Sequence, residues 1–72
     1  MDDLDRLINE IMIVLDNDLP NELANYKYEF EELINGQLMR ASYDVLNKLS
    51  KDKRWKPSIR FFGLLERYKI VF

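Results

Sequence analysis

The sequence predicts an all-α protein that folds as one compact, bundle-like domain of four helices joined by short loops. Apolar residues recur along most of the chain at intervals of three and four, which is the period of an amphipathic helix. The chain has only two glycines and two prolines, and three of these four residues lie between the apolar-periodic segments. Seventy-two residues are too few for two separately buried cores, so we expect a single domain over residues 1–72.

The first two helices are expected over residues 2–16 and 21–35. Aspartates at positions 2, 3 and 5 fall in the first turn of the first helix, where the helix dipole favours negative charge. Pro20 suits the entry to the second helix because its backbone angle is fixed and it lacks an N–H donor. Gly36 follows that helix, where we expect it to take the left-handed conformation that ends many helices. The apolar positions are Leu4, Leu7, Ile8, Ile11 and Leu15, then Leu23, Tyr26, Phe30, Leu33 and Ile34.

The third helix is expected over residues 38–49 and carries two adjacent apolar stripes, so it should contact two neighbouring helices. One stripe consists of Leu38, Ala41, Val45 and Leu49, and the other of Met39, Tyr43 and Leu46. The second stripe packs inside the bundle or, where the fourth helix leaves it uncovered, serves a partner.

The fourth helix is expected over residues 57–69, opened by Pro57 and Ser58. Its apolar stripe consists of Phe61, Leu64, Leu65 and Tyr68. Gly63 inside a helix costs about 1 kcal/mol relative to alanine, which suggests that another helix passes close to it. Residues 69–72 either continue this helix or pack as an extended end.

The amino-acid composition argues against catalysis and against metal or cofactor binding by this protein. Without cysteine or histidine, the chain has no thiol nucleophile, no usual metal ligand and no usual near-neutral general base. We therefore expect no enzyme activity, no metal and no cofactor. No stretch approaches the roughly 18 apolar residues of a membrane span, and the acidic beginning is unlike a signal peptide. We expect a soluble, cytoplasmic protein without a membrane partner.

Charge is distributed unevenly along the chain. Residues 1–36 hold ten acids and two bases, a net charge of −8, whereas residues 37–72 hold nine bases and three acids, a net charge of +6. One explanation is that the two halves neutralise each other when they pack together. The other is that an acidic surface stays exposed and binds a basic partner. The two explanations are compatible.

Tyr28 marks a candidate binding surface on the second helix. With Phe30 as the buried direction, a rotation of 100° per residue turns Tyr28 almost directly outward. The carboxylates around this ring would steer a basic partner, and tyrosine is enriched at interface hot spots. The proposed partner-binding residues are Asp16, Asp18, Glu22, Asn25, Tyr28, Glu29 and Glu32, with Glu31 on the flank. The plainer alternative is an ordinary acidic solvent face.

Two other segments suggest different functions. Residues 48–60 place six bases around Trp55, which could contact a phosphate backbone and stack a base. In an acidic protein this segment more simply forms a solvated link with Trp55 folded onto the core, so nucleic-acid binding is the less favoured alternative. The stripe of Met39, Tyr43 and Leu46 would suit an oligomerisation or adaptor module, such as a weak homodimer.

Residues 19–46 resemble the small all-helical immunity proteins of bacterial contact-dependent inhibition and Maf-type toxin systems. Leu19 and Pro20 match the hydrophobic-proline pair that precedes the second helix of that family. The motif that follows in the family spans the junction of helices two and three. Residues matching it are Glu31, Leu33, Gly36 and Ala41.

Three positions depart from that family motif. Gln37 and Leu38 stand at the glutamate and aromatic positions, and Tyr43 stands where an acid is common, with Asp44 one place later. The resemblance implies a bacterial protein that binds the toxin domain of its own system, frequently a basic nuclease, and blocks it. The family motif assigns no role to the acidic and aromatic surface around Tyr28.

Overall fold

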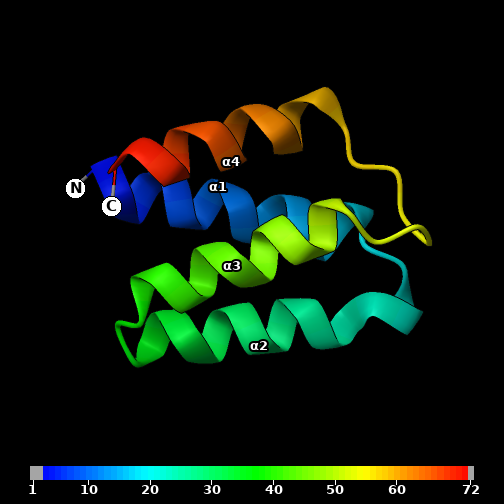
Figure 1. The fold of residues 1–72 in the computed structure, drawn as a ribbon, viewed down its shortest axis with the longest axis horizontal. Helices are drawn as coiled ribbons and strands as arrows, with labels where there is room; N and C mark the ends of the chain where they lie inside the picture. Colours follow the sequence, from blue (N-terminus) through cyan, green and yellow to red (C-terminus); the bar gives the residue numbers. More distant parts are fainter. Residues whose placement is uncertain (1–2, 72) are drawn as a thin grey trace.

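The computed structural model describes residues 3–71 and confirms the all-α class. Its elements are α1 (Asp3–Asp18), the short 3-10 helix η1 (Asn21–Leu23), α2 (Ala24–Asn35), α3 (Met39–Ser50) and α4 (Ile59–Val71). Consecutive α-helices run in opposite directions, and the start of α1 and the end of α4 lie at the same end of the molecule (Figure 1). Asp2 and Phe72, at the ends of predicted segments, lie outside the described residues.

α2 ends at Asn35 as predicted, and the other helix boundaries differ from the predicted ones by one to three residues. α1 continues two residues beyond the predicted end, to Asp18, because no helix breaker precedes Pro20. Ser58 lies just before α4, and its Oγ accepts a hydrogen bond from the Phe61 N–H at 3.1 Å, so it caps the helix. At the other end, residues 69–71 continue α4, so the extended alternative is wrong for them.

The turn between α2 and α3 corrects the prediction for Gly36. Gly36 has a φ of −84°, whereas Gln37 has a φ of 59° and is the left-handed residue. The Leu38 N–H donates to the Leu33 carbonyl and the Gln37 N–H to the Ile34 carbonyl, both at 2.9 Å. These two bonds form the Schellman closure of a helix, in which the left-handed position belongs to Gln37.

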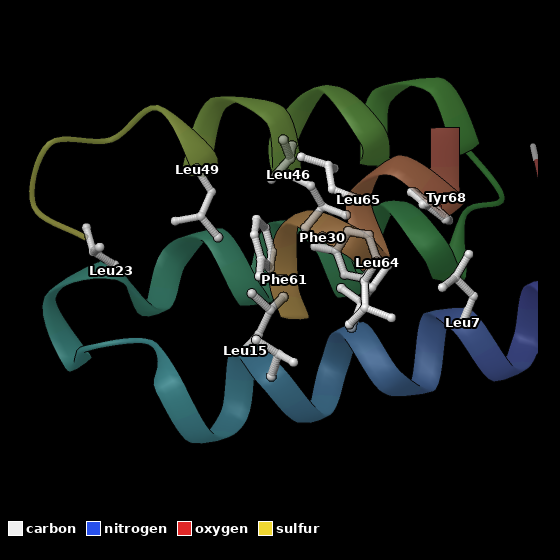
Figure 2. Packing of buried hydrophobic residues seen from close by; sticks show 13 residues of the cluster. Leu7, Leu15, Leu23, Phe30, Leu46, Leu49, Phe61, Leu64, Leu65 and Tyr68 are labelled. Carbon is white, nitrogen blue, oxygen red and sulfur yellow. The ribbon is translucent and has the colours of Figure 1, made fainter. Parts of the chain in front are cut away.

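The core lies between all four helices. Phe30 of α2 and Tyr68 of α4, both fully buried, meet edge to face with ring centroids 6.1 Å apart. Figure 2 shows Phe30, Phe61 and Leu64 near the middle of this core and Leu23 toward one end. The buried apolar residues are Leu7, Ile11, Val14, Leu15, Leu23, Phe30, Val45, Leu46, Leu49, Phe61, Leu64, Leu65 and Tyr68.

One polar contact lies within this core. Ser42 is fully buried, and its Oγ donates to the Met39 carbonyl at 2.6 Å. The Ser42 hydroxyl has a single hydrogen, so the Tyr68 hydroxyl, 2.6 Å away, is the donor toward Ser42 Oγ. This bond joins α3 to α4 and satisfies polar groups that burial would otherwise penalise.

α3 contacts both α2 and α4, as its two apolar stripes predicted. Leu46 is fully buried and Met39 and Tyr43 pack half-buried against the core, so the bundle covers much of the stripe proposed for oligomerisation. Leu38, in contrast, is exposed just before α3 begins. No described residue beyond its own helical turn lies within 4 Å of the place where a Gly63 Cβ would stand, so the expectation of a close helix at Gly63 is wrong.

Candidate functional site

The orientation of α2 places Tyr28 on the outside of the molecule. Phe30 is fully buried, and Tyr28, two residues earlier and about 160° away around the helix, is 61% exposed, as predicted. All seven proposed partner-binding residues are exposed to solvent. Asn25, Tyr28, Glu29 and Glu32 lie on α2, Glu22 lies on η1, and Asp16 and Asp18 end α1.

A shallow hollow of about 110 Å³ lies beside Tyr28, where the end of α1 meets the start of α2. It brings Asp16 and Tyr28, two of the proposed residues, into one concave surface. Its floor and walls are a mixture of apolar and polar groups, so it could accept a side chain with an apolar stem and a polar end. The lining residues are Leu15, Asp16, Leu19, Asn21, Ala24, Lys27 and Tyr28.

Lys27 is the residue of this surface that the sequence reasoning missed. Its ammonium group makes an ion pair with the Asp16 carboxylate and lies 5.6 Å from the centroid of the Tyr28 ring. The hydrogen bond with Asp16 raises the pKa of Lys27 above its ordinary value. The charge of Asp16 is therefore already balanced from within the chain. The signal that could have revealed Lys27 was its position as one of two bases in the acidic half.

The three glutamates of α2 lie at the surface. Glu29, Glu31 and Glu32 are exposed, and none of the ion pairs formed by residues 3–71 involves them. On the helix, Glu31 and Glu32 lie within about 60° of Tyr28, whereas Glu29 is about 100° away. Glu31, placed on the flank by the sequence, thus lies closer to the ring direction than Glu29. We call Asn25, Tyr28, Glu29, Glu31 and Glu32 the acidic face of α2.

A hydrogen-bonded anchor holds the opposite side of α2. The Tyr26 hydroxyl donates to Asp52 Oδ2 at 2.9 Å, and the Asp52 side chain is only 10% exposed. Asp52 also accepts bonds from the Arg54 backbone N–H, Nε and a terminal guanidinium nitrogen, at 2.9, 3.0 and 2.8 Å. The bonds from Arg54, followed by that from Tyr26, hold the pKa of the Asp52 carboxyl well below its usual range. This anchor ties the α3–α4 loop to α2.

The same loop contains the basic segment 48–60. Arg54 is engaged by Asp52, and Asp52, followed by weaker contributions including that of Glu22, raises the Arg54 pKa. Trp55 is half-buried and packs edge to face on Phe61, with centroids 5.0 Å apart, which confirms that it folds onto the core. The segment therefore presents exposed lysines, while its one indole is already packed against protein.

The described residues offer no group of side-chain donors for a metal ion. Within residues 3–71, no three Asp or Glu side chains gather closely enough to hold an ion. Over the same residues, no helix has the length and apolar character needed to cross a bilayer.

Comparison with known protein families, curated proteins and solved structures found no match to this chain.

Proposed function

We propose that this protein is an immunity protein that binds a basic toxin domain through the acidic face of α2 and blocks it. The observation that carries the proposal is the exposure of Tyr28 among carboxylates that are not paired within the described chain. Exposed like charges attract an oppositely charged partner and speed its approach, and a rigid aromatic ring supplies contact area at low entropic cost.

Inhibition on this proposal is steric and electrostatic. Glu29, Glu31 and Glu32 meet lysines and arginines of the toxin, while Tyr28 and Asn25 form the centre of the contact. A nuclease uses its basic surface to hold phosphates, so a protein that covers that surface removes the substrate site without any reaction. Asp18 and Glu22 lie near the start of α2 and extend the negative potential. Asp16 contributes less, because Lys27 balances its charge.

The arrangement of the remaining chain favours this function over nucleic-acid binding. A stacking platform needs an open aromatic face, and the ring of Trp55 packs against Phe61. The charge of Arg54 is balanced by Asp52. A gel-shift titration at low salt provides the check, because a regulator would retard nucleic acid and an immunity protein would not.

The test is protection of cells that make the toxin. An immunity gene is expected directly downstream of its toxin gene. The toxin used in the test is therefore the C-terminal domain of the protein that the upstream gene encodes. We expect the wild-type chain to restore growth and Tyr28→Ala combined with Glu32→Lys to lose that protection. Because both residues are exposed, the variant should keep the helical circular dichroism of the wild type.

A matched control exists on α4. Phe62→Ala combined with Glu66→Lys also removes an exposed ring and reverses a charge at a spacing of four residues. This control should protect as well as the wild type. Equal protection by the Tyr28 and Glu32 variant would contradict the assignment of the surface, and a failure of the wild type to protect would contradict the function.

A further inference from the structure

α4 carries a second apolar face outside the core, where the Phe62 ring packs edge to face on Phe61 and remains partly exposed. Ile59 is 91% exposed, Ile70 is 81% exposed and Phe62 is 45% exposed. Together with Gly63 and Glu66 they occupy an arc of about 100° on the helix, and the buried residues of α4 lie on the other side. We call these five residues the outer stripe of α4. α4 lies at one edge of the molecule, away from α2 (Figure 1).

Gly63 lies near the middle of this stripe and has no side chain, so the helix surface is lower there than at the neighbouring apolar residues. A glycine weakens a helix interior, and here no other part of the described chain approaches the place of its missing side chain. The absence of a side chain does, however, let a second backbone come close. An exposed helix face with large apolar residues around a glycine therefore suits contact with another helix.

We propose that the outer stripe of α4 binds the same stripe of a second copy of this chain, with the two helices antiparallel. The stripe has an isoleucine near each end and Gly63 and Glu66 between them. A two-fold axis at its centre places Ile59 of one copy against Ile70 of the other. The same axis places Glu66 against Gly63. A two-fold interface of this kind uses one surface twice and closes on itself.

The charges on α4 favour the antiparallel arrangement. Over Gly63 of the second copy, the Glu66 carboxylate comes within reach of that copy's Arg60, which is exposed one turn away. Arg67, one turn to the other side, already pairs with Glu10 of its own chain at 3.8 Å. Two-fold symmetry forms the contact between Glu66 and Arg60 twice. In a parallel arrangement Glu66 would face Glu66, and like charges directly opposite one another repel.

The charge of α4 also distinguishes this surface from the acidic face of α2. Glu10 balances Arg67, so Arg60 and Lys69 against Glu66 leave only one net positive charge on the exposed part of α4. This part of α4 lacks the group of carboxylates that would attract a basic toxin domain. The inference does not rest on the proposed immunity function, and a dimer through α4 leaves the acidic face of α2 open on both copies. One pair of helices covers less than the roughly 1,200 Å² of a stable interface, so the dimer is weak.

Sedimentation equilibrium of the purified wild-type chain from about 10 µM to about 1 mM tests the proposal. We expect the mean molar mass to rise from that of the monomer toward twice that value as the concentration increases. A monomer at every concentration overturns the proposal. Association into species larger than a dimer also overturns it, because a closed two-fold contact stops at two copies.

Two charge variants test the pairing of Ile59 with Ile70. Ile59→Glu/Ile70→Glu and Ile59→Lys/Ile70→Lys should each be folded monomers, since these side chains are exposed and like charges meet in the dimer. Mixing the two variants should restore a dimer containing one copy of each. Dimers of either variant alone, or no association in the mixture, contradict the antiparallel arrangement.

Two single substitutions complete the test. Gly63→Ala should weaken dimerisation at least about tenfold by separating the helices, although the added methyl group meets nothing in the monomer. Leu38→Lys, which changes an exposed apolar residue before α3, should leave dimerisation unchanged. Loss of the dimer in Leu38→Lys would place the interface elsewhere and overturn the proposal.

Discussion

The ammonium group of Lys27, on α2, forms an ion pair with the carboxylate of Asp16, on α1. The pair joins two helices at the edge of the hollow beside Tyr28, and the Lys27 ammonium lies near that ring. A partner's lysine or arginine that approached Tyr28 would therefore meet a cation already in place. Lys27 moderates the negative potential of the acidic face of α2.

Replacing Lys27 with glutamine should strengthen binding of a basic toxin domain. The substitution frees the Asp16 carboxylate and makes the surface more negative by one charge, so we expect the association rate at low salt to rise roughly two- to fivefold. Asp16→Asn is the matched control, because it leaves Lys27 without its partner and should slow association. Stopped-flow fluorescence measures both rates. Slower association for Lys27→Gln would contradict a role for negative charge here.

The bonds that Asp52 accepts, chiefly from Arg54 and then from Tyr26, should make stability depend on pH below neutrality. Because the Asp52 pKa is lowered in the folded protein, its stabilising effect is complete above the unfolded pKa and is lost as the pH falls below about 4. Wild type and Asp52→Asn should therefore differ in unfolding free energy at pH 7 and converge toward pH 2. Urea denaturation at both pH values measures this, and a gap that widened in acid would contradict it.

Tyr26→Phe should remove one donor to Asp52 and leave the ring in place. We expect a loss of about 1 kcal/mol in unfolding free energy at pH 7. Tyr28→Phe is the control, because it removes a hydroxyl from an exposed ring on the same helix. Unchanged stability of Tyr26→Phe in urea would show that the loop is held without this bond.

Gln37→Gly should stabilise the protein by about 1 kcal/mol, since glycine adopts the left-handed conformation without the steric cost of a Cβ. Gln37→Ala keeps that cost and serves as the control. Gly36→Ala should be tolerated, because an added Cβ would lie at ordinary contact distances of 3.6 to 3.9 Å from its neighbours. Thermal unfolding measures all three, and destabilisation by Gln37→Gly would contradict the turn geometry.

Gly63→Ala should raise the unfolding free energy of the monomer by about 1 kcal/mol, which is the helix preference of alanine over glycine. The position is exposed, and the new methyl group has open space around it. The unfolding free energy should be measured at low micromolar protein concentration, where the monomer dominates. A less stable variant under these conditions would mean that another part of the chain does approach Gly63.

The fold could be predicted because helical periodicity and punctuation are local properties. Phe30 fixed the buried direction of α2, and helix geometry then placed Tyr28 outside. The site was less predictable, because its ion pair joins Asp16 to Lys27 across two helices and depends on how those helices pack. The same limit applies to Asp52. In the sequence it is one acid among the bases of a link, whereas in the structure it accepts hydrogen bonds from Tyr26 and Arg54.

Glycine positions were the least predictable feature. At the end of α2 the chain places the left-handed turn at Gln37, one residue after the glycine, because the carbonyls of Leu33 and Ile34 accept the closing bonds. Gly63 was expected to mark a close contact inside the monomer, and the structure leaves it at the surface. In both cases the sequence indicated a special backbone position, and its role depended on the three-dimensional surroundings.

The most direct measurement is a binding titration of the neighbouring gene's toxin domain with the wild-type chain and with Tyr28→Ala/Glu32→Lys, each at low and at physiological salt. If the acidic face of α2 is the interface, the variant should bind at least about 100-fold more weakly. Added salt should also slow association with the wild type more than with the variant. Equal affinities and equal salt dependence for the two chains would contradict it.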